Sequence, residues 1–125
     1  KRVGDLRDRT SLDEAVRGCE SLFHVAADYR LWSRTPQDLY DINVDGTQNI
    51  FEAAAQAEIQ KVVYTSTVGC IGLNHDGQPA DEETPFEPKT LSNDYKISKY
   101  MAEIPNKPRF HLILDSTRFS ATDSV

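Results

Sequence analysis

Lys61-Val62-Val63-Tyr64-Thr65-Ser66 is a short, β-branched run that predicts a buried strand. A helical pattern precedes it from Pro36 to about Ala57, and proline suits the first turn of a helix. Earlier still, Ser21-Leu22-Phe23-His24-Val25-Ala26 is nearly continuous in apolar residues, which predicts a strand buried on both faces. Strand, helix and strand in this order predict an α/β fold with a doubly wound parallel sheet.

The flanking segments extend the same alternation. Arg2 to Leu6 is typical of the end of another strand, and Ser11-Leu12-Asp13-Glu14 has the capping-box spacing that begins a helix. Residues 67–93 are rich in Gly, Pro, Asp and Glu and predict a long loop, which suggests a functional one. A last clear helix is predicted from Asp94 to about Glu103, and Phe110 to Leu114 has the pattern of one more strand.

Composition excludes several classes of protein. Fourteen Lys and Arg against 20 Asp and Glu give the 125 residues a net charge of −6, so we expect neither a nucleic-acid nor an anionic-membrane partner. No apolar run is long enough to span a bilayer. Cys19 and Cys70 form no disulfide framework, which favours a cytoplasmic protein, and His24, His75 and His111 lack metal-ligand spacing, so no metal site is predicted.

The residues that follow the predicted strands should share one edge of the sheet. Parallel α/β sheets bind ligands at the carboxyl ends of their strands. The segments expected at that edge are Asp5-Leu6, Val25-Ala26-Ala27 and Ser66-Thr67.

Tyr95 and Lys99 are four residues apart and therefore share one face of the last helix. A free tyrosine has a pKa of about 10, and a nearby cation lowers that pKa by favouring the phenolate. A hydroxyl from Thr67 or Ser66 would complete a proton-transfer device beside a carbonyl or alcohol. Alone, Tyr-x-x-x-Lys is a weak signal that occurs by chance and is more typical of a plain solvated helix face.

Other residues have simple structural interpretations. His24 and Cys70 are expected to be packed inside, Asn74 to Gly77 to form a turn, and Tyr29 and Trp32 either to line a substrate pocket or to cover the core.

The Tyr95–Lys99 pair belongs to a set of six sequence motifs. In chain order they are Gly4-Asp5-Leu6, His24-Val25-Ala26-Ala27, Asn43-Val44-Asp45-Gly46-Thr47, Thr65-Ser66-Thr67, Glu82-Glu83-Thr84-Pro85-Phe86-Glu87-Pro88 and Tyr95-Lys96-Ile97-Ser98-Lys99. This set resembles the extended short-chain dehydrogenase/reductase family of NAD-dependent epimerases and dehydratases. The segments from Phe23 to Trp32 and from Pro79 to Glu82 most resemble the hopanoid-associated sugar epimerase branch, close to dihydroflavonol reductases.

The resemblance implies a role for each matching position and NAD or NADP as cofactor. The implied catalytic residues are Thr67 as the hydroxyl (Ser66 second), Tyr95 as acid and base, Lys99 on the nicotinamide ribose, and Asn43 for helix geometry and a water near Lys99. The implied cofactor-binding residues are Asp5 and Leu6 at the adenine, Val25, Ala26 and Ala27 at the ribose and pyrophosphate, and Thr65, Ser66, Tyr95 and Lys99 further along.

The implied reaction is hydride transfer at a carbinol carbon of a sugar or related small molecule. A dihydroflavonol- or steroid-like ketone reductase is the alternative within enzymes, and a non-catalytic dinucleotide-binding sensor or remnant is the alternative outside them. NAD and NADP stay unresolved, because the residue that reads the 2′ position follows a strand outside these motifs. Full-length relatives are expected to be homodimers, through the helix starting at Pro36 and the helix carrying Tyr95.

The resemblance covers about residues 2–103 and lacks the Gly-rich turn that cradles the pyrophosphate. We therefore expect residues 1–103 to be part of an NAD(P)-binding Rossmann domain and residues 104–125 to be a divergent tail. The chain is expected to be an internal fragment without the first strands and the substrate domain, inactive on its own.

Overall fold

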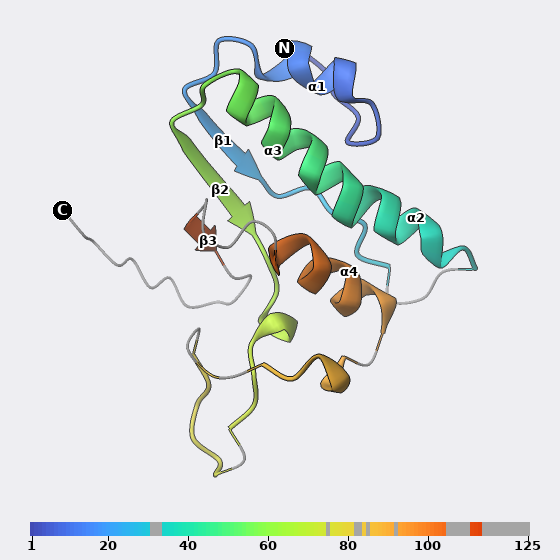
Figure 1. Ribbon diagram of the computed structural model, residues 1–125, viewed down its shortest axis with the longest axis vertical. Helices are drawn as coiled ribbons and strands as arrows, with labels where there is room; N and C mark the ends of the chain where they lie inside the picture. Colours follow the sequence, from blue (N-terminus) through green and yellow to red (C-terminus); the bar gives the residue numbers. More distant parts are fainter. Residues whose placement is uncertain are drawn as a thin grey trace, which may run out of the picture.

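The computed structural model describes residues 1–30, 34–74, 76–81, 84, 86–91 and 93–104, and the backbone of 111–113. The described part is an α/β arrangement around a parallel sheet. Its strands are β1 (Ser21–His24), β2 (Lys61–Thr65) and β3 (His111–Ile113), in the order β1-β2-β3 (Figure 1). The predicted fold class and the predicted additional strand are therefore confirmed.

One long helical stretch connects β1 to β2, as the sequence predicts. It consists of α2 (Pro36–Tyr40), a π-helical turn (Asp41–Asp45) and α3 (Gly46–Gln56), which follow one another without a break in Figure 1. The π turn takes up one extra residue within the helix. It buries Asn43 while Leu39 before it and Ile50 after it also face inward.

The hydrophobic core lies between this helix, α1 (Arg9–Val16) and one face of the sheet. α1 packs against α3, and Gly18, which follows α1, has a φ of 80° that favours glycine. The buried members of the core are Leu12, Val16, Ile50, Phe51, Ala53, Ala54, Val62, Tyr64 and Ala102. Each fully buried large apolar side chain contributes about 1.5 to 3 kcal/mol, so this cluster fixes the sheet against the helices.

α4 (Asp94–Glu103) lies past the carboxyl end of β2 (Figure 1). Its N-cap is Asn93, whose side chain accepts a hydrogen bond from the Lys96 amide at 2.9 Å. The long loop before it contains two short 3₁₀ turns, Val68–Cys70 and Pro88–Thr90. α4 packs against α2, the π turn and the first of these 3₁₀ turns, so it joins the loop to the helix layer.

Two expectations for the first residues are wrong. Arg2 to Leu6 is irregular rather than a strand, because its polar backbone groups bond locally: the Asp5 amide donates to Ser11 Oγ, and the Asp5 carbonyl accepts from the Asp8 amide. The helix begins at Arg9, not near Ser11, because the Asp8 carboxylate caps it.

The expectation that the strand from Ser21 is buried on both faces is also wrong. The strand ends at His24, its one buried residue, and Phe23 is 65% exposed. Leu22 and His24 face the layer of α1 and α3, whereas Phe23 points to the opposite face. In the described part of the chain, helices cover this strand on one side.

Candidate functional site

β1 and β2 end at the same edge of the sheet, where the sequence predicts a ligand. His24, the last residue of β1, is in register with Tyr64 of β2. The residues that follow differ sharply in burial, because Val25 is 67% exposed and Ser66 only 2%. α4 lies next to the end of β2 (Figure 1), and its residue Glu103 binds Ser66.

Lys99 is held at the end of β2 by two contacts. Its side chain is 2% exposed, and its Nζ donates a hydrogen bond to the Thr65 carbonyl at 2.8 Å. The same Nζ lies 4.2 Å from the centroid of the Tyr64 ring, a cation–π contact. Buried ammonium groups need such partners, and the expected functional lysine therefore has a fixed position.

Ser66, the next residue along, binds a carboxylate that the sequence interpretation did not single out. Its Oγ donates to Glu103 Oε2 at 2.6 Å, and Glu103 is 4% exposed. Glu103 lies one helical turn after Lys99 on the same face of α4. That spacing was the available signal, but the partner of Glu103 is 37 residues away in sequence.

Thr67 and Tyr95 lie on elements that pack together. The Thr67 hydroxyl accepts from the Gly69 amide at 3.3 Å and caps the turn Val68–Cys70, against which α4 packs. A Cβ on Gly69 would lie 3.2 Å from the side chain of Lys96, so the glycine permits this close approach. Tyr95 is half-buried; burial raises the pKa of Tyr64, and the nearby Tyr95 phenol adds a small part to that rise.

Asn43 connects the segment after β1 to α4. Its Oδ1 accepts from the Asp28 amide at 2.7 Å, and its Nδ2 donates to the Asp28 carbonyl and to Ser98 Oγ, each at 2.9 Å. Ser98 Oγ in turn donates to the Tyr95 carbonyl at 2.8 Å. One chain of hydrogen bonds thus runs from the end of β1 to the turn that carries Tyr95.

Buried aromatic and polar groups surround this region. The His24 ring stacks on Tyr64 with centroids 5.3 Å apart, and its Nε2 lies 3.0 Å from Thr47 Oγ1. Burial and then the Lys99 charge lower the pKa of His24 to about 4. Burial, aided by Glu103, raises the pKa of the Cys70 thiol to about 11. Both residues are packed inside, as predicted.

The expected adenine-binding residues have other contacts in this structure. The Asp5 carboxylate accepts from the Arg7 amide at 2.9 Å and from its Nη2 at 2.8 Å, which lowers the pKa of Asp5 to about 2. Leu6 packs against Gly46, where a Cβ would lie only 2.8 Å from Leu6 Cβ. The Leu6 carbonyl accepts from Asn49 Nδ2 at 2.9 Å, so Leu6 is docked on α3.

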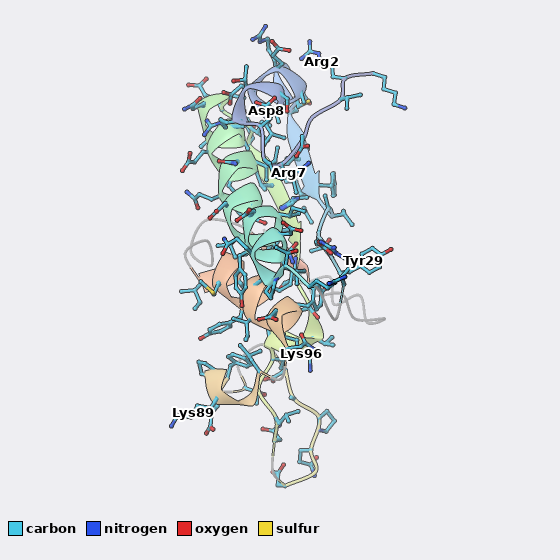
Figure 2. All side chains as sticks on the ribbon, turned by 90° about the vertical axis from the view of Figure 1, so that its right-hand side faces the viewer. Arg2, Arg7, Asp8, Tyr29, Lys89 and Lys96 are labelled. Carbon is cyan, nitrogen blue, oxygen red and sulfur yellow. The ribbon has the colours of Figure 1, made fainter. Side chains whose placement is uncertain are left out.

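The remaining expectations divide by what the structure describes. Tyr29 is 79% exposed and projects from the ribbon in Figure 2, whereas Trp32, His75, Glu82, Glu83 and Pro85 lie outside the described residues. Among the residues that are described, no group of His, Cys, Asp or Glu side chains could hold a metal ion. Within that same part of the chain, no helix has the length and apolar character needed to cross a membrane.

Comparison with known proteins decides the family. The model of the 3-beta hydroxysteroid dehydrogenase/isomerase family matches residues 2–105. The chain belongs to this family. The resemblance to NAD-dependent epimerases and reductases of the extended short-chain type is thereby confirmed.

The chain matches only part of the length of its individual relatives. A putative dihydroflavonol 4-reductase of Synechocystis sp. is 48% identical over 101 residues, which cover 81% of this chain and 29% of the relative. An N-acetyl-alpha-D-glucosaminyl-diphospho-ditrans,octacis-undecaprenol 4-epimerase of Escherichia coli O157:H7 is 35% identical over 101 residues, 81% of this chain and 29% of the relative. The chain thus spans less than a third of these relatives.

Solved structures share the fold. The crystal structure of gox2253 is 43% identical, has a TM-score of 0.78, and is matched over 90% of this chain and 36% of its own. Structures below 25% identity share the same fold, and some of them hold NAD or NADPH.

Proposed function

We propose that this chain carries the proton-transfer residues and part of the cofactor site of an NAD(P)-dependent enzyme. The reaction interconverts an alcohol and a ketone carbon in a sugar or a related small molecule. One observation carries the proposal: buried Lys99 binds the carbonyl of Thr65, two residues before Thr67, and shares its helix face with Tyr95. In this proposal, Thr67, Tyr95 and Lys99 act together at the end of β2.

The proposed roles follow from the chemistry of the side chains. Tyr95 gives a proton to the substrate oxygen or takes one from it, and the ammonium of Lys99 favours the phenolate that this requires. The Thr67 hydroxyl donates to the same substrate oxygen and fixes its place. Asn43 holds the helix turn of Tyr95 through Ser98.

The residues at the sheet edge fit a dinucleotide better in some places than in others. When bound, NAD or NADP supplies hydride transfer at its nicotinamide ring. Ala26 and Ala27 have small side chains, and the exposed backbone after β1 can approach a ribose or pyrophosphate closely. Asp5 fits less well, because an adenine amino group would share its carboxylate with Arg7.

The substrate class has two candidates. A sugar is supported by the motifs between Phe23 and Glu82 and by the 35% identical lipid-linked sugar epimerase. A dihydroflavonol-like ketone is supported by the higher identity, 48%, to the putative dihydroflavonol reductase. In the first case the transient ketone is reduced again from its other face, and in the second case reduction is the whole reaction.

We further propose that these 125 residues do not catalyse the reaction alone. The free edge of β1 and the exposed side chains Phe23 and Val25 leave the cofactor side of the sheet open in the described part of the chain. An open edge of this kind favours self-association over a defined binding surface.

Titration of NADH and NADPH fluorescence tests the proposal, in parallel on the 125-residue chain and on the complete gene product. We expect saturable binding to the complete product that weakens at least about tenfold in Lys99→Ala, because the ammonium and its fixed position are lost. Lys89→Ala is the matched control, since Lys89 is an exposed lysine on the turn far from β1 and β2 (Figure 2).

Equal binding by wild type and Lys99→Ala would remove Lys99 from the cofactor site. Failure of the complete product to bind either cofactor would overturn the proposed function. Turnover by the 125 residues alone would overturn the proposal that they do not catalyse the reaction, and saturable micromolar binding by them would contradict the argument that their open edge leaves no defined binding surface.

A further inference from the structure

We propose that Ser66 and Glu103 form a positioning pair that fixes Thr67 relative to Tyr95 and Lys99. The pair acts on the reaction through the residues it holds and touches neither substrate nor cofactor. The inference rests on the proposed function, because it assigns the pair a part in the same proton transfer.

The contact between the two side chains is short and enclosed. Ser66 Oγ lies 2.6 Å from Glu103 Oε2, and the two residues are 2% and 4% exposed. Hydroxyl donors approach a charged carboxylate to about 2.5–2.7 Å, closer than they approach a neutral acceptor. Buried polar groups cost free energy unless they are paired, so each side chain favours the position of the other.

The pair adds a second point of attachment between α4 and β2. Lys99 binds the Thr65 carbonyl, and one turn later Glu103 binds the Ser66 hydroxyl. Consecutive turns of α4 therefore bind the consecutive residues Thr65 and Ser66 at the end of β2. Together with the packing of α4 against α2, the π turn and the turn Val68–Cys70, these two contacts fix the rotation and register of α4 at the end of β2.

Thr67 is the next residue after this double attachment, and Tyr95 lies two turns before Glu103 on the same helix face. Fixing Ser66 against Glu103 therefore fixes the distance between the two groups proposed to act on one substrate oxygen. Displacing such a group by about 1 Å costs up to about 100-fold in rate.

The same contact distinguishes the two hydroxyls that follow β2. The Ser66 hydroxyl donates its proton to Glu103 inside the protein. The Thr67 hydroxyl accepts from the Gly69 amide and is less deeply buried, so its own proton is directed elsewhere. Ser66 is thus assigned to positioning, and Thr67 is the hydroxyl left for the substrate.

The experiment measures steady-state kinetics of the complete gene product. The probes are dihydroquercetin with NADPH and UDP-N-acetylglucosamine with NAD⁺. All assays are run far below the melting temperature of each variant. The variants are Ser66→Ala, Glu103→Met, their double substitution, and Glu103→Gln, which keeps an oxygen to accept the Ser66 hydrogen bond. Glu20→Gln, at an exposed glutamate before β1, controls for the loss of one negative charge.

We expect Ser66→Ala and Glu103→Met each to lower kcat about 10- to 100-fold while KM for the cofactor changes less than about twofold. The double variant should lose no more than the worse single variant, because both substitutions break one contact. Glu103→Gln should recover most of the activity, and Glu20→Gln should match wild type.

Wild-type kcat in Ser66→Ala, or losses that multiply in the double variant, would overturn the pair in an otherwise active enzyme. A wild type that turns over neither probe and binds neither NADH nor NADPH would overturn the proposed function and the pair together. If Glu103→Met fails to fold, Ser66→Ala and Glu103→Gln still decide the question, because the first loses the contact and the second keeps it.

Discussion

The ends of β1 and β2 lie side by side at one edge of the sheet, yet they differ in almost every physical respect. After β2, Ser66 and Lys99 are each 2% exposed, and both bind partners contributed by the chain itself. After β1, Val25 is 67% exposed. The groups proposed for proton transfer are therefore positioned from within, whereas the backbone proposed for the cofactor is an open surface.

The largest effect should come from Tyr95→Phe in the enclosed half of the site. Loss of the phenol hydroxyl removes the proposed acid and base but keeps the ring. We expect kcat to fall about 10²- to 10⁴-fold, the usual share of general acid–base catalysis. Cofactor affinity should stay within about twofold, since the exposed backbone after β1 is unaltered. Turnover and NADPH fluorescence in the complete gene product measure the two quantities.

Tyr100→Phe is the control for this variant. Tyr100 is on the same helix and packs on Phe86, with ring centroids 4.6 Å apart, so the loss of its hydroxyl should leave kcat unchanged. Equal activity of both variants would mean that α4 carries no proton-transfer residue at Tyr95. The comparison between the two strand ends would then lose its functional meaning.

The two faces of β1 itself should differ in their contribution to stability. Phe51, 3% exposed, packs edge-on against the His24 ring on the covered face, while Phe23 is 65% exposed on the other face. Phe51→Ala should cost about 3–5 kcal/mol of the free energy of unfolding, because it leaves a cavity. Phe23→Ala should cost no more than about 0.5 kcal/mol. Urea denaturation followed by circular dichroism measures both.

A cost for Phe23→Ala close to that of Phe51→Ala would mean that something covers the outer face of β1 in solution. The openness of the β1 end would then be a property of these 125 residues in isolation. A concentration-dependent cost would identify the cover as a second copy, since exposed apolar side chains on a sheet face favour association with another chain.

The sequence predicted correctly those elements whose signals lie in neighbouring residues. The strand around Val63, the helix from Pro36 and the helix from Asp94 depend on neighbouring residues, and all three are present. Family membership was also accessible, because the motifs keep their order and spacing. The strand expected from Arg2 to Leu6 is absent, because the backbone of Asp5 bonds to Ser11 and Asp8 instead, and the residues of the segment do not reveal those contacts.

The contacts that define the enclosed half of the site were not accessible in this way. Ser66 meets Glu103 across 37 residues, and Asn43 meets Ser98 across 55. No short-range pattern encodes such pairs, since they exist only once α4 has docked on the end of β2 and on the π turn. The spacing of Lys99 and Glu103 indicated a shared helix face but not which strand residues that face would bind.

The smallest expected effect concerns His24, which ends β1 on its covered face. Its pKa is lowered to about 4, by burial first and then by the charge of Lys99, from an ordinary value of 6.5. The unfolded chain therefore takes up a proton at this residue below about pH 6.5, while the folded protein does not until about pH 4. The contribution of His24 to the free energy of unfolding should be fully present above pH 6.5. The free energy of unfolding should then fall by about 3 kcal/mol as the pH drops to 4.

Urea denaturation between pH 7 and pH 4 measures this slope, and His24→Asn should flatten it. The absolute stability of the variant also falls, because the contact with Thr47 and the stacking on Tyr64 are lost. The slopes are therefore what must be compared. Carboxylates with lowered pKa values, such as Asp5, lose their contribution in stronger acid, and they do so alike in both proteins. Equal slopes would mean that water reaches the His24 ring from the open end of β1. The solvent exposure seen at Val25 would then extend one residue further into the strand, to His24, despite the buried contacts of the His24 side chain.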